Sequence, residues 1–151
     1  MTGKELQIKL GNATEKLVSK TLRSFGYWNY VLPKKAEGQP CDIVAMKGID
    51  VKNKVEIIAW MIDAKHVENK ASFTFDRIEP NQISSLSYAR DFAKIQGYRG
   101  YTGFAIFFDR DKQLYWLSFD QYQKMAENGE KSVNMQELRL LSEVLTDANN
   151  Y

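Results

Sequence analysis

Cysteine and histidine are almost absent from this chain of 151 residues, because Cys41 is the only cysteine and His66 the only histidine. A disulfide within one chain and a zinc site built from cysteine and histidine are therefore excluded. A serine hydrolase would have to use His66 as its base, which makes that class a poor fit. The sequence has no run of about 18 apolar residues, so it predicts no transmembrane helix. The start lacks the apolar core of a signal peptide, so we expect a cytoplasmic protein without a membrane partner.

Neither sign of charge prevails over the whole chain, which has a formal net charge of +2. The distribution is nevertheless uneven. Residues 1–35 carry seven basic side chains against only Glu5 and Glu15, whereas the stretch after Met125 is acidic. A basic end permits a polyanion as partner. A solvated, lysine-rich helix face explains the same charges equally well.

The length and the 44% of hydrophobic residues suit one ordered domain over residues 1–151. No internal repeat or low-complexity segment interrupts it. The tail, residues 146–151, is expected to be frayed.

An apolar run from Val55 to Ile62 predicts a buried strand, and it ends on Asp63-Ala64-Lys65. Side chains alternate along a strand, so Asp63 and Lys65 are expected to face the same way. A carboxylate and an ammonium at the end of a buried strand are costly unless they are paired, hydrated or bound to an ion. Such a pair suits phosphodiester hydrolysis with a divalent metal. An ordinary ion pair has the same spacing, so this tripeptide alone decides nothing.

The other patterns predict the order helix, three strands, helix, two strands, helix. The expected elements are a helix from Thr2 to Phe25 with a break or second start allowed near Gly11, strands at 27–32, 43–46 and 55–62 with a turn over 47–54, a helix at 80–95, strands at 104–108 and 113–117, a helix at 119–126, and a short last helix beginning with the capping pattern of Asn134 and Glu137.

Three further polar residues fall where these elements can bring them together. Glu15 is predicted at the edge of the buried stripe of the first helix, although a partner in a solvated helix fits its spacing too. Asp42 opens one strand and Asp63 ends the next, so an antiparallel hairpin would make the two carboxylates neighbours. Gln82 lies in the first turn of the helix that begins at Pro80.

Taken in order, Glu15, Asp42, Asp63, Lys65 and Gln82 resemble the PD-(D/E)xK nuclease superfamily, and most closely the RecU-type Holliday-junction resolvases. The matching stretches are Pro40-Cys41-Asp42 with the strand after it, Asp63-Ala64-Lys65, Ser72-Phe73, Asn81-Gln82-Ile83 and Phe104 to Phe119. The resemblance thus covers roughly residues 40–120 as well as the Glu15 helix. The resemblance implies an α/β fold with a restriction-endonuclease-like core, in which helices flank a mixed central β-sheet.

The sequence departs from that family in three places. Cys41 separates Pro40 from Asp42, and Asp63 stands where the resolvases usually have glutamate. Only a short loop lies between Leu32 and Asp42, where the resolvases carry a protruding stalk. A smaller relative from a phage or mobile element, without the stalk, fits this pattern.

The resemblance also implies a Mg²⁺-dependent endonuclease, with Mn²⁺ able to substitute. Asp42, Asp63, the Ala64 carbonyl and Glu15 would provide the metal ligands. Lys65 would orient the attacking water, and Gln82 would position the water or a phosphate oxygen. DNA, branched or duplex, would be the substrate. A DNA-binding module without cleavage, a non-specific, flap or restriction-type nuclease, and a scaffold with an ordinary ion pair are the alternatives.

Basic and aromatic residues give the remaining expectations. The candidates for contacts with the DNA backbone are Lys34, Lys35, Lys70, Arg77 and Arg99. The resemblance further implies a homodimer, since resolvases pair two active sites. The aromatic residues that could support it are Tyr27, Trp28, Tyr30, Tyr98, Tyr101, Tyr115 and Trp116. The alternative is that these rings fill the core. For Tyr27, Trp28 and Tyr30, we also favour a position in the core over stacking on DNA bases.

Overall fold

The computed structural model describes residues 2–34 and 38–150, and a six-stranded sheet runs through its centre. The helices are α1 (Gly3–Ser24), α2 (Pro80–Gln96), α3 (Phe119–Glu127) and α4 (Leu141–Asn149), and the central strands are β1 (Trp28–Val31), β2 (Ile43–Val51), β3 (Lys54–Val67), β5 (Arg99–Phe108), β6 (Gln113–Ser118) and β8 (Arg139–Leu140). A second, two-stranded sheet pairs β4 (Ser72–Thr74) with β7 (Ser132–Asn134), and the 3₁₀ turns are η1 (Phe75–Arg77) and η2 (Met135–Glu137).

The central sheet is mixed, as predicted, with the strand order β1-β2-β3-β5-β6-β8. β3 and β5 are parallel, and every other pair in this sheet is antiparallel. The parallel pair needs a crossover, which the chain makes through β4, η1 and α2. The predicted order of the main elements is therefore confirmed, and the short strands β4, β7 and β8 are additions.

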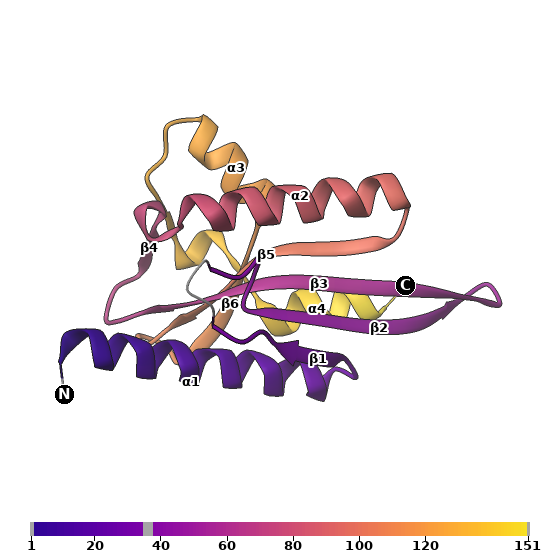
Figure 1. Cartoon of the computed structure of the whole chain (residues 1–151), viewed down its shortest axis with the longest axis horizontal. Coiled ribbons are helices and arrows are strands. Elements are labelled where there is room, and N and C mark those ends of the chain that lie inside the picture. Colours follow the sequence, from indigo (N-terminus) through magenta and orange to yellow (C-terminus); the bar gives the residue numbers. More distant parts are fainter. Residues whose placement is uncertain (1, 35–37, 151) are drawn as a thin grey trace.

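Helices cover both faces of the sheet (Figure 1). On one face, Leu22 of α1 and Leu145 of α4 pack with Trp60 of β3 in one buried cluster. On the other face, Leu86 of α2 and Phe119 of α3 belong to a second buried cluster. Since both faces of the central strands are covered, β3 and β5 consist largely of apolar residues.

α1 is one continuous helix. Thr2 and Glu5 form the predicted capping box, in which each side chain accepts a hydrogen bond from the other residue's backbone N–H. The break or second start near Gly11 is wrong, because the helix continues unbroken from Gly3 to Ser24. A single glycine costs a helix only about 1 kcal/mol, which the packing of Val18 and Leu22 outweighs.

β2 and β3 form a longer hairpin than the sequence predicted. The expected turn over residues 47–54 is reduced to Lys52 and Asn53, which both have positive φ, as a tight two-residue hairpin turn requires. β3 also continues beyond Asp63 as far as Val67, because it pairs with β5 through Phe108. Asp63 is therefore an interior residue of the strand and does not mark its end.

The C-terminal region differs most from the prediction. Asn134 and Glu137 do cap a helical turn, but it is the 3₁₀ turn η2, and the last α-helix begins at Leu141. The frayed tail is wrong for residues 146–149, which belong to α4. Ala148 is buried there, and the Asn149 amide donates a hydrogen bond to the Phe25 carbonyl. Residue 151 lies outside the described residues.

The expectation of core positions for the first aromatic cluster holds only for Tyr27. Trp28 and Tyr30 are exposed on the edge strand β1, with 59% and 52% of their surface accessible. Within the described residues, no helix combines the length and the apolar character that crossing a membrane requires.

Candidate active site

Asp42 and Asp63 meet at one position of the β2–β3 hairpin. Ile43 pairs with Ile62, and the Asp42 N–H donates a 3.0 Å hydrogen bond to the Ile62 carbonyl. The register therefore places the residue before Ile43 beside the residue after Ile62. Two carboxylates that are far apart in the sequence become neighbours, as the sequence predicted.

Asp63 is the most deeply buried charged residue of this pair, with 1% of its surface exposed. Its Oδ2 atom has no hydrogen-bond partner among the described residues. Burial, together with the nearby charge of Asp42, raises the pKa of Asp63 from 3.8 to about 7, and the ammonium of Lys65 opposes this rise only in part. A buried carboxylate oxygen without a partner is costly, and a cation would relieve that cost.

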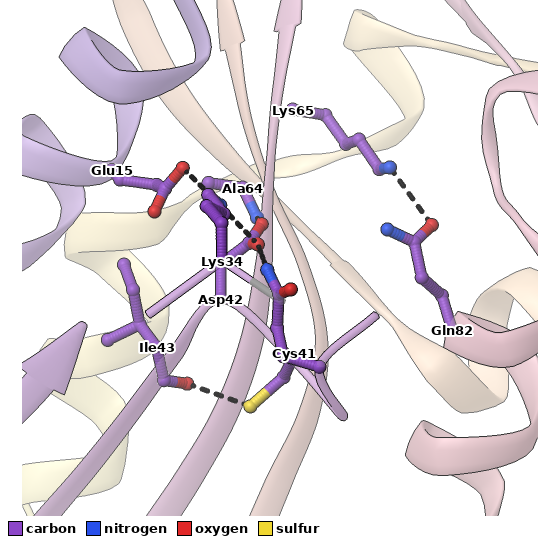
Figure 2. A network of polar contacts seen from close by, with 9 residues as sticks. Glu15, Lys34, Cys41, Asp42, Ile43, Ala64, Lys65 and Gln82 are labelled. Atoms are coloured by element: carbon purple, nitrogen blue, oxygen red, sulfur yellow. Dashed lines mark hydrogen bonds and ion pairs between the residues drawn. The ribbon is translucent and has the colours of Figure 1, made fainter. Parts of the chain in front are cut away.

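Asp42 is held by three hydrogen bonds. Its Oδ2 accepts from the Ala64 N–H at 2.9 Å, and its Oδ1 accepts from Gln39 and Lys34, each at 3.0 Å. The Lys34 ammonium also donates to Glu15 Oε2 at 2.8 Å (Figure 2). Glu15 comes from α1, so this lysine connects the helix to the hairpin.

Glu15 is buried at the edge of the apolar stripe of α1, as its spacing predicted. Burial raises the pKa of Glu15, and the nearby charge of Asp42 acts in the same direction, whereas the hydrogen bond from Lys34 lowers it. Glu15 and Asp42 thus belong to one electrostatic cluster with Lys34 between them.

Lys65 lies two residues after Asp63 on β3 and is held from the side of α2. Its ammonium donates to Gln82 Oε1 at 3.0 Å (Figure 2). It also donates to the Arg77 carbonyl at 3.2 Å. The same Gln82 oxygen accepts the Glu79 N–H and so caps α2. Burial lowers the pKa of Lys65, although the charges of Asp63 and Asp42 oppose this effect. Gln82 therefore fixes the direction of a desolvated lysine.

These residues fit a hard divalent cation that keeps several waters. No three His, Cys, Asp or Glu side chains of residues 2–34 and 38–150 converge on one point where they alone could hold a metal. Mg²⁺ commonly binds through one or two carboxylates, with water and substrate phosphate completing its shell. Asp42 and Asp63, with the unpartnered Oδ2 of Asp63, match that need. Glu15 is bonded to Lys34 instead.

A cleft of about 530 Å³ opens beside Lys65. Lys70 and Arg77 line it, and Gly11 of α1 forms part of its wall. Arg77 also donates a hydrogen bond to the His66 carbonyl, which fixes its side chain along the cleft. Two of the predicted backbone-contacting residues therefore lie next to Lys65.

The other predicted basic contacts are placed differently. Lys34 is bonded to the carboxylates, and Lys35 lies outside the described residues. Arg99 pairs in register with Ile58, five residues before Asp63, and at roughly 3.3 Å per residue that is about 16 Å away. It forms an ion pair with Glu56. Arg99 therefore does not belong to this cluster.

Two residues of the site were not predicted in their observed roles. Gln39 contacts Asp42, and Lys34 bridges Asp42 and Glu15. Both lie in the loop between β1 and β2. Their nearness to Asp42 in the sequence was the only available signal, and it does not reveal where a flexible side chain ends.

Comparison with known proteins identifies the fold. No family model and no curated protein sequence matches the chain. The solved structure of Hjc, a Holliday junction resolvase from Archaeoglobus fulgidus, aligns with a TM-score of 0.59 and 18% identity over 89% of this chain and 99% of that one. A nuclease from a fusselovirus aligns with a TM-score of 0.51 and 12% identity over 99% of this chain and 94% of that one. The chain therefore has the restriction-endonuclease-like fold, which confirms the fold prediction.

Proposed function

We propose that the chain is a metal-dependent DNA endonuclease that hydrolyses phosphodiester bonds. The observation that carries this proposal is the pairing of Asp42 with the buried Asp63, whose Oδ2 has no partner, two residues before a desolvated Lys65. The likeness to a resolvase and a viral nuclease supports it. An ordinary ion pair would join Asp63 to Lys65, but within the described residues the Lys65 ammonium donates to Gln82 and to the Arg77 carbonyl instead.

Each residue has a defined task in the proposed reaction. Asp42 and Asp63 would hold Mg²⁺ or Mn²⁺, which when bound polarises a phosphoryl oxygen and lowers the pKa of water. Lys65 would place its ammonium beside the negative charge that develops on the phosphoryl oxygens, and Gln82 keeps that ammonium in place. Lys70 and Arg77 contact the DNA backbone along the cleft, which positions the strand without reading its sequence.

The direct test is nicking of supercoiled plasmid by purified variants. We expect D42A and D63A to lose Mg²⁺-dependent cleavage while they remain folded, because each lacks a cation ligand. We expect K65A to lose turnover by about a hundredfold or more yet to bind DNA like the wild type, since Lys65 acts on charge in the transition state. D50A provides the matched control, because Asp50 is an exposed carboxylate at the far end of β2.

Wild-type cleavage by D42A or D63A would overturn the assignment of the site. DNA binding by the wild type without any nicking would favour the non-cleaving DNA-binding module. Normal cleavage by K65A together with weak DNA binding would make Lys65 a phosphate contact only.

We propose further that the enzyme prefers branched DNA of the Holliday-junction kind and acts as a homodimer in the cytoplasm. The likeness to a Holliday junction resolvase supports the preference, and symmetric cleavage of two strands requires two active sites. The short loop before Asp42 leaves non-specific, flap or restriction-type cleavage as alternatives. Rates on matched linear, flapped and four-way substrates distinguish them.

A further inference from the structure

Lys34 lies inside the carboxylate cluster although its side chain could extend into solvent. Its ammonium is 2.8 Å from Glu15 Oε2 and 3.0 Å from Asp42 Oδ1. The Glu15 and Asp42 side chains are only 9% and 11% exposed, whereas that of Lys34 is 54% exposed. The lysine therefore reaches from the surface inward to two buried acids (Figure 2).

The contacts of Glu15 show which positive charge its carboxylate binds. Among the described residues, the Lys34 ammonium is the only hydrogen-bond or ion-pair partner of the Glu15 carboxylate. Asp42, by contrast, divides its two oxygens between Lys34, Gln39 and the Ala64 N–H. In a two-metal site, a second divalent ion would need the carboxylate oxygens of Glu15 as ligands. Here the ammonium of Lys34 supplies the positive charge beside that carboxylate.

The formal charges of the cluster also disfavour a second divalent ion. With all three carboxyl groups ionised, Glu15, Asp42 and Asp63 carry three negative charges, and Lys34 and Lys65 carry two positive ones. One divalent ion bound by Asp42 and Asp63 would make the cluster slightly positive. A second ion beside Glu15 would be repelled both by the first ion and by Lys34.

We propose, on the basis of the nuclease function inferred above, that Lys34 takes the place of a second metal ion. Its ammonium holds Glu15 and Asp42 together, so that each chain binds a single divalent ion. Lys34 is on this view a positioning residue of the metal centre, and its main task is not a contact with the DNA backbone.

The experiment counts bound ions without relying on cleavage. Isothermal titration of the DNA-free protein with Ca²⁺ gives the stoichiometry and the affinity. We expect one ion per chain for the wild type and two for K34M, since methionine has a similar length but no charge. An opposite charge within ~4–6 Å changes the proton affinity of a carboxylate about tenfold or more, so the second ion should bind K34M at least about tenfold more tightly than the wild type.

Three further variants locate the effect. K34R keeps the charge and should restore one ion per chain. E15Q/K34M lacks the proposed second carboxylate and should also return to one. K16M removes a neighbouring positive charge from the exposed side of α1 and should behave like the wild type. Circular dichroism of each variant establishes that it is folded, and K34M without metal should melt at a lower temperature than K34R.

The outcomes separate this inference from the proposed function. One ion per chain in both the wild type and K34M, or two in the wild type, would overturn the role of Lys34 and leave the nuclease intact. A wild type that binds no divalent ion and does not nick DNA would overturn both.

Discussion

Burying the carboxylate of Asp63 lowers the stability of the fold whenever that group is ionised. Its pKa of about 7 means that the folded chain keeps a proton that the unfolded chain loses near the ordinary value of 3.8. Between these two pH values the folded state binds more protons than the unfolded state. Stability without metal must therefore fall as pH rises from about 4 to 7.

This linkage predicts that D63N stabilises the metal-free protein in a pH-dependent way. One pKa unit corresponds to about 1.4 kcal/mol, so we expect a gain in the free energy of unfolding of about 2 to 4 kcal/mol at pH 8. At pH 4 the gain should almost vanish, because Asp63 of the wild type is then protonated in the folded state. Urea unfolding in the presence of a chelator measures both values.

The control is D50N, at an exposed carboxylate of the same hairpin, which should change stability by less than about 0.5 kcal/mol. An equal gain for D63N at both pH values would mean that the titration of Asp63 does not set the stability of the site.

Residue spacing carried most of the information about the site. The alternation along a strand placed Asp63 and Lys65 on one side, and the hairpin argument brought Asp42 to them. The role of Lys34 could not be predicted in this way, because its four-carbon side chain can point to DNA or to Glu15 with equal ease. Only the positions of α1 and the β1–β2 loop decide between the two.

At the scale of single elements, α1 contains a testable weakness. Gly11 lies in the middle of this helix, and a Cβ atom built there meets no heavy atom within 4 Å. We expect G11A to raise the free energy of unfolding by about 0.5 to 1 kcal/mol, since alanine loses less backbone entropy than glycine when a helix forms. Chemical unfolding monitored by circular dichroism measures the change.

The matched control is G97A. Gly97 ends α2 with a φ of 75°, a conformation that alanine rarely adopts, so this substitution should destabilise the protein. A loss of stability in G11A would indicate that α1 is not regular at Gly11.

Elements with strong local signals were predicted well, and those fixed by distant partners were not. The capping box of Thr2 and the glycine after α2 gave the correct helix ends. The length of β3 depends on its pairing with β5, and that pairing cannot be read from β3 itself. The last helix, α4, also takes its place from packing, because Leu145 and Ala148 are buried against the sheet.

At the scale of the whole molecule, exposed apolar residues gather on the edge strand β1 and on α2. Register pairs Tyr30 with Val44, and Val44 with Met61 on the next strand, so the three side chains share one face of the sheet. Met61 also lines a cleft of about 530 Å³ together with Tyr88 and Phe92 of α2. We name this surface, from Trp28, Tyr30 and Met61 to Tyr88 and Phe92, the sheet–helix surface.

The sheet–helix surface gives the proposed homodimer a location. Tyr88 is 74% exposed and Phe92 43%, and exposed aromatic residues are enriched in the cores of interfaces. A two-fold interface would bury the same patch on both chains, so one substitution would act twice. The alternative expectation, that the aromatic residues fill the core, is met by the buried Tyr27 and Trp116 but not by Trp28 or Tyr30.

We therefore predict that Y88E converts the proposed dimer into a monomer. A charge at the centre of an apolar interface is left without a partner, and the dissociation constant should rise by about thirtyfold or more. Sedimentation equilibrium at micromolar concentration should give the mass of two chains for the wild type and of one for Y88E. I8E is the control, since Ile8 is also an exposed apolar residue but belongs to α1, which packs on the opposite face of the sheet. A mass of one chain for the wild type at all loadings, with and without DNA, would reject the dimer and leave an enzyme that nicks one strand at a time.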